Sequence, residues 1–236
     1  MTGTELAADV VVIGGGMGGV AATLAAARLG AKVLLVEELD WLGGQLTSQA
    51  VPPDEYPWIE YLTASQSYAS LRETIRAYYR RHMPLTDAAR MLVRLNPGQG
   101  NVSSLCHEPW VAVKAIDELL APHMAAGRVT VLQKHRTLKV EADRDRIRAV
   151  HVHDIEGGAM RVLSAPLFID ATEIGDLLEM AGVEHVFGAE AQSQTSELHA
   201  LAEADPFDQQ AITWCLAADY LPGEDTPSTN PLATSA

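Results

Sequence analysis

The stretch Asp9-Val-Val-Val-Ile13-Gly14-Gly15-Gly16-Met17-Gly18-Gly19 decides the fold of this 236-residue chain. Its run of β-branched apolar residues is typical of a strand that a parallel sheet buries on both faces. The Ala- and Leu-rich residues 20–29 that follow the glycines predict a helix, with Gly30 placed to end it. A second apolar run over residues 31–36 predicts the next strand, so the stretch opens a βαβ unit.

Three of the glycines, Gly14, Gly16 and Gly19, match the spacing GxGxxG. The first permits a tight turn from strand to helix, the second lets a pyrophosphate approach the backbone, and the third lets the helix pack on the strands. The N–H groups at the helix start then hold the diphosphate. Glu37, at the tip of the second strand, can accept both ribose hydroxyls and repels the 2′-phosphate of NADP. These residues predict a dinucleotide site, and the alternative is an ordinary glycine-rich turn.

Two further stretches, Leu42-Gly-Gly-Gln-Leu-Thr47 and Leu167-Phe-Ile-Asp-Ala-Thr-Glu-Ile-Gly-Asp176, narrow the ligand. With them the sequence resembles the FAD-dependent oxidoreductases of the glutathione-reductase-like superfamily. It is most similar to the branch that also resembles fumarate-reductase and succinate-dehydrogenase flavoproteins. The resemblance implies FAD as the cofactor, with the glycine pair near its flavin end and the second stretch beside it. A surface turn at the glycine pair, and a helix N-cap at Asp176, are the alternatives.

The cofactor-binding candidates from the motif and the resemblance are Gly14, Gly16, Met17, Gly18, Gly19, Glu37, Glu38, Gly43, Gly44, Gln45, Asp170, Ala171, Thr172 and Asp176. The resemblance also implies that backbone groups near Arg136 and Thr137 contact the adenine. No residue is assigned as a catalytic acid or base.

The predicted fold class is α/β, a Rossmann-like FAD-binding domain with a central parallel sheet, helices and a small antiparallel β-meander. The pattern predicts a helix over 109–126, a strand over 129–132 and meander strands over 137–141, 147–152 and 160–163. Residues 1–50 and 101–190 form the discontinuous FAD-binding domain. Residues 51–100 are a mainly helical insertion, and residues 191–236 are the start of an incomplete, truncated substrate domain with a helix around 206–218 and a flexible tail.

Residues 59–83 of the insertion predict a helix with a basic side. That side consists of Arg72, Arg76, Arg80, Arg81 and His82. It is interpreted as a solvated face in preference to a surface for an anionic substrate. In the loop before the next helix, the adjacent Cys106 and His107 are interpreted as structural, because neighbouring residues of an extended segment point to opposite sides.

The formal net charge of −14 argues against general affinity for nucleic acid or anionic lipid. The two cysteines form no disulfide framework or metal motif, which suits a cytoplasmic location, and no metal is expected. No signal peptide is predicted, and the uncharged run over residues 10–27 is interpreted as strand, turn and small-residue helix rather than a membrane span.

The predicted function is an FAD-binding oxidoreductase that transfers electrons between the flavin and a small organic substrate. The resemblance fails near the end of the chain, where relatives continue into a substrate domain and a last FAD-binding segment. The alternative is therefore a catalytically incomplete nucleotide-binding fragment or module that needs further chain or a partner. An NAD-dependent dehydrogenase would share the opening unit, but it would not account for the two later stretches. The substrate, the electron acceptor and the oligomeric state are left open.

Overall fold

The fold centres on a four-stranded parallel sheet, seen in a computed structural model that describes residues 4–53, 58–62, 64–212, 215 and 222–223. The strand order is β4-β3-β2-β8. The strands are β2 (Val10–Ile13), β3 (Val33–Val36), β4 (Val129–Leu132) and β8 (Leu167–Asp170). Every residue of β2 and β3 is buried, as the apolar runs predicted.

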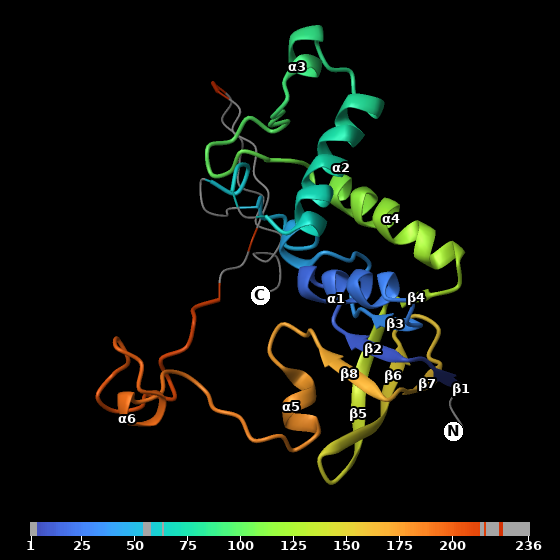
Figure 1. Cartoon of the computed structure of the whole chain (residues 1–236), viewed down its shortest axis with the longest axis vertical. Helices are drawn as coiled ribbons and strands as arrows, with labels where there is room; N and C mark the ends of the chain where they lie inside the picture. Colours follow the sequence, from blue (N-terminus) through green and yellow to red (C-terminus); the bar gives the residue numbers. More distant parts are fainter. Residues whose placement is uncertain (1–3, 54–57, 63, 213–214, 216–221, 224–236) are drawn as a thin grey trace, which may run out of the picture.

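Two different layers cover the two faces of this sheet (Figure 1). Val10 and Val12 of β2 share a core with α1 (Met17–Arg28) and α4 (Pro109–Ala125). Val11 and Ile13 face the other way and pack with residues of the antiparallel strands described next. Successive side chains of a strand point to opposite faces, so an uninterrupted apolar strand requires both layers.

The β-meander consists of β5 (His135–Asp143), β6 (Arg146–Asp154) and β7 (Met160–Ser164). Neighbouring strands of the meander pair antiparallel, which confirms the predicted arrangement. One strand was not expected: β1 (Thr4–Ala7) pairs parallel with β7. Its four residues are mostly exposed and carry no apolar alternation, so only the open edge of β7 makes this segment a strand.

The segment between β3 and α4 contains α2 (Gln66–His82) and α3 (Asp87–Met91). The predicted start of the first of these helices at residue 59 is wrong, because Ser65 caps it by accepting a hydrogen bond from the Tyr68 backbone N–H at 3.2 Å. Leu71, Ile75 and Tyr79 of α2 are buried in the same core as α4. The division of the chain into domains remains a prediction.

The basic side of α2 is solvated at Arg81 and His82, but the sequence-based interpretation is wrong for Arg72 and Arg76, which are buried. Arg72 and Arg76 are only 3% and 4% exposed and both donate hydrogen bonds to Glu60. Arg80 donates to the carbonyl groups of Leu92 and Val93. A long apolar stem and a fork of donors let arginine cross a core and bind oxygens beyond it, which residue type alone does not reveal.

Beyond β8 the chain forms α5 (Asp176–Met180) and α6 (Gln192–Thr195). The helix predicted around 206–218 is wrong over residues 206–212, where the chain is non-helical and Phe207 and Ile212 are more than 90% exposed. Without a surface to bury an apolar face, a short helix is not stable. Most of the rest of that segment, and the tail over 224–236, lie outside the described residues. Among the described helices, none is long and apolar enough to cross a membrane.

Candidate nucleotide-binding site

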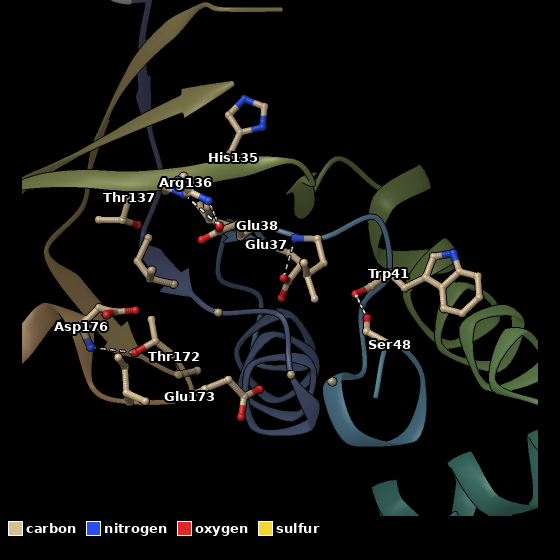
Figure 2. A pocket seen from close by; sticks show the side chains of 18 of the residues that line it. Glu37, Glu38, Trp41, Ser48, His135, Arg136, Thr137, Thr172, Glu173 and Asp176 are labelled. Carbon is tan, nitrogen blue, oxygen red and sulfur yellow. Dashed lines mark hydrogen bonds and ion pairs between the residues drawn. The ribbon is translucent and has the colours of Figure 1, made fainter. Parts of the chain in front are cut away.

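Two cavities meet at the start of α1. The sheet cavity, of about 460 Å³, lies at the carboxyl ends of β2, β3 and β8 beside the start of β5. Figure 2 shows its lining, with Glu37 and Glu38 on one side and Thr172, Glu173 and Asp176 on another. The helix cavity, of about 540 Å³, lies between the start of α1, the 3₁₀ turn η1 (Gly44–Leu46) and α2. The residues common to both linings are Gly16, Ala171, Thr172 and Glu173.

Two glycines of the GxGxxG motif bring backbones into close contact. Gly14 has φ +98°, and a Cβ there would lie 2.1 Å from the carbonyl oxygen of Ala171. A Cβ at Gly19 would lie 1.9 Å from the carbonyl oxygen of Gly14. Side chains at either position would therefore separate β2, β8 and α1, which is the packing role expected for these glycines.

Two of the glycines between them, Gly16 and Gly18, face open space instead. A Cβ at Gly16 would meet only the Glu173 carboxylate, at 3.3 Å, and a Cβ at Gly18 would meet nothing within 4 Å. Gly16 lines both cavities, and Met17 and Gly18 line the helix cavity. The first N–H groups of a helix have no acceptors within it, so this bare surface at the start of α1 suits an anion.

The two residues of the glycine pair, Gly43 and Gly44, have different roles. Gly43 has φ +108° and donates its N–H to the Gly15 carbonyl at 2.8 Å, and a Cβ there would lie 2.6 Å from Ile116. Gly43 therefore faces the core, and its amide is not directed at a ligand as the sequence suggested. Gly44 lines the sheet cavity and the next residue, Gln45, lines the helix cavity.

The two acids after β3 have different partners. Glu37 accepts hydrogen bonds from the backbone N–H of Gly15 at 2.7 Å and of Leu39 at 2.8 Å. These bonds fix the carboxylate at the cavity wall and leave acceptor capacity for hydroxyl donors. Glu38 forms an ion pair with Arg136 of β5 at 2.5 Å, so an arginine from the meander reaches the end of β3 (Figure 2).

The turn after β8 is held by Asp170. Its carboxylate accepts hydrogen bonds from the N–H and hydroxyl of Thr172 and from the N–H of Leu177. It lines neither cavity, whereas Ala171 and Thr172 line both and Asp176 lines the sheet cavity. The N-cap of α5 is Gly175, with φ +74°, so the interpretation of Asp176 as the cap is wrong. The αL conformation requires the glycine, and Asp170 supplies the oxygen that a capping side chain would provide.

Several lining residues were not predicted from the sequence. In the sheet cavity they include Trp41, Ser48, His135 and Glu173, and in the helix cavity Pro53 and Tyr68. Glu173 lies within the stretch 167–176, whose resemblance to the flavoprotein family already indicated a place beside the cofactor, so the sequence could have predicted it. Tyr68 belongs to α2, and no local pattern predicts that this helix reaches the start of α1.

Cys106 and His107 line neither cavity. Cys106 is buried in its own loop, where its N–H donates to Asn96 at 2.6 Å and its carbonyl accepts from Gly98 at 2.8 Å. Burial lowers the pKa of His107, and this outweighs the raising effect of its hydrogen bond to the Glu108 carbonyl. These contacts support the structural interpretation of both residues. Within the described part of the chain no group of side chains has the arrangement of a metal site.

Comparison with protein families finds a match. The model of the family described as "FAD dependent oxidoreductase" matches residues 9–233, which is nearly the whole chain. Comparison with curated proteins finds no match.

Several solved structures are similar to this chain at low sequence identity and low TM-score. L-proline dehydrogenase from P. horikoshii is 17% identical with a TM-score of 0.38, and the match covers 72% of this chain and 23% of that one. Quinol fumarate reductase from E. coli is 14% identical with a TM-score of 0.43, covering 71% and 33%. Glycerol-3-phosphate dehydrogenase from Bacillus halodurans, complexed with FAD, is 15% identical with a TM-score of 0.45, covering 73% and 36%. The chain thus spans about a quarter to a third of the length of these proteins.

Proposed function

The chain belongs to the FAD dependent oxidoreductase family, and from this membership we propose that it binds FAD across the two cavities and transfers electrons between the flavin and a small organic substrate. The cofactor of the family is FAD. The proposal places the ADP half in the sheet cavity, the flavin half in the helix cavity and the diphosphate between them.

The observation that carries the proposal is the meeting of the two cavities at Gly16, where α1 begins. A dinucleotide is an elongated ligand with its anionic diphosphate in the middle. Here the middle of the site has a glycine whose missing side chain leaves room, next to the positive end of a helix. The residues present therefore fit the group that the family uses.

In the ADP half, Glu37 would accept the ribose hydroxyls. Its two backbone hydrogen bonds hold the carboxylate in place, so little conformational entropy is lost when a ligand binds. The adenine would lie against the start of β5, at Arg136 and Thr137, which line the same cavity. The ion pair between Glu38 and Arg136 would form the outer edge of this part of the site.

In the flavin half, the backbone of Gln45 and the side chains of Pro53 and Tyr68 would form the walls of the helix cavity. FAD supplies the electron-transfer chemistry when bound, and these residues bind and orient it. Thr172 would lie beside the diphosphate, since it lines both cavities. No side chain at this end is assigned as a catalytic acid or base. The cytoplasmic location stays a proposal that rests on the sequence.

The absorbance spectrum of the purified chain tests the proposal. FAD added and then removed by gel filtration should leave a yellow protein that absorbs near about 450 nm, by the general chemistry of flavins. Gly16→Val should abolish this band, because the branched side chain occupies the space for the diphosphate, and keep the circular dichroism spectrum, because a Cβ at this position meets only a movable carboxylate. Cys106→Ser is the control and should stay yellow, because Cys106 lines neither cavity. A wild-type protein that stays colourless would refute the proposal. If the protein is yellow and its bound flavin can be reduced, candidate substrates can be tested by following the reduction of an artificial electron-acceptor dye.

A further inference from the structure

The carboxylate of Glu173 lies where the two cavities join. Cβ atoms built on Gly16 and on Gly44 would each lie 3.3 Å from Glu173 Oε1, so this oxygen is between the two glycines. Figure 2 shows the side chain extending from the turn after β8 toward the start of α1, whereas Asp176 lies on the other side of that turn. Any group that contacts the backbone of Gly16 or Gly44 must come close to this carboxylate.

The surroundings of Glu173 do not neutralise its charge. The lining of the sheet cavity has four carboxylates, those of Glu37, Glu38, Glu173 and Asp176. The same lining has one guanidinium, that of Arg136, which is paired with Glu38. Among the described residues no hydrogen bond or ion pair to the exposed Glu173 side chain is found. Among the described lining residues, an anion at the start of α1 therefore has the helix dipole, backbone N–H groups and neutral side-chain donors to stabilise it, but no unpaired guanidinium or ammonium group.

We infer that Glu173 is an affinity-setting residue, whose carboxylate repels the diphosphate and so weakens the binding of FAD and of other diphosphate ligands. This inference rests on the proposed function. Coulomb repulsion between the carboxylate and a diphosphate at such short range lowers the affinity on the order of tenfold at an exposed site. The repulsion acts on the charged middle of the cofactor and spares its uncharged ends.

Equilibrium titration of the wild type and Glu173→Gln with FAD, ADP, adenosine and riboflavin tests this inference. At low salt E173Q should bind FAD and ADP roughly tenfold more tightly. Adenosine and riboflavin, which carry no phosphate, should bind the two proteins equally. The gain should shrink in about 0.5 M salt, where charges at the surface are screened.

Glu179→Gln is the matched control, because Glu179 is also exposed, follows on α5 and lines neither cavity. Equal tightening in E179Q would mean that net charge alone sets the affinity, which overturns the inference. Unchanged binding of FAD to E173Q overturns it and leaves the proposed function standing. Weaker binding also overturns it, since the carboxylate would then accept a hydrogen bond from the cofactor. If neither protein binds FAD or ADP, the proposed function and the inference both fail.

Discussion

At the scale of single residues, the glycines of the opening motif are not equivalent. Gly14 and Gly19 are required where backbone passes against backbone, whereas Gly16 and Gly18 face open space. The spacing in the sequence does not distinguish these two uses. The glycine pair behaves in the same way, since Gly43 packs on Ile116 and only Gly44 lines a cavity.

The contrast between Gly14 and Gly18 predicts opposite effects of alanine. Gly14→Ala should lower the free energy of unfolding by about 2–4 kcal/mol, because it combines a φ of +98° with a clash against the Ala171 carbonyl. Gly18→Ala should raise it by up to about 1 kcal/mol, because the residue is helical and its Cβ meets nothing. Urea unfolding followed by circular dichroism measures both. Equal losses in the two variants would contradict this distinction.

At the scale of elements, α2 is attached to the preceding and following loops through buried charge. Glu60 accepts hydrogen bonds from Arg72 and Arg76, and Arg76 also donates to the Leu95 carbonyl at 3.1 Å. One carboxylate therefore connects the segment before α2, the helix itself and the loop that leads to α4. This contact also orients the helix that brings Tyr68 to the helix cavity.

Removal of the charge at Glu60 should loosen this attachment. Glu60→Gln leaves two buried guanidinium groups without their carboxylate, and we expect the free energy of unfolding to fall by about 3 kcal/mol. Thermal unfolding with and without the substitution measures the loss. Glu118→Gln is the control, because Glu118 pairs with Arg81 at the surface, and its midpoint should stay close to that of the wild type. An equally large loss of stability in Glu118→Gln would show that the burial of Glu60 and its two arginines does not make this ion pair more stabilising than a surface pair.

At the scale of the whole molecule, the same cluster makes stability depend on acid pH. Burial acts to raise the pKa of Glu60, but the hydrogen bonds from Arg76 and Arg72 outweigh it and lower the pKa from 4.5 to about 2. A carboxyl group whose pKa is lower in the folded state stabilises the fold above its unfolded pKa. This stabilisation is lost as the pH falls from 4.5 toward 2.

We therefore expect the difference in unfolding free energy between the wild type and Glu60→Gln to be greatest near neutral pH. This difference should narrow by about 1–3 kcal/mol as the pH falls below about 4.5. Water that reaches the carboxylate screens its charge and keeps the change within this range. Urea unfolding of both proteins in a pH series measures it. A difference that stays constant down to about pH 3 would show that the pKa of Glu60 is not lowered.

The sequence by itself determined the βαβ opening, the main strands and helices of the nucleotide-binding fold from β2 to β8, without β1 and α3, and the class of ligand. These features rest on local patterns: an apolar run, a glycine spacing and an acid at a strand tip. The sequence also determined α4, β4 and the three meander strands, because the hydrophobic periodicity that predicts each of them lies within its own residues.

Only the tertiary structure decided what depends on residues far apart in the chain. The strand β1 exists because β7 has an open edge, and the arginines of α2 are buried because Glu60 and two loops surround them. The meeting of two cavities at Gly16, with Glu173 beside it, depends on how the turn after β8, the loop after β3 and α2 pack around the start of α1. Long-range packing creates these neighbours, and no local pattern in the sequence carries that information.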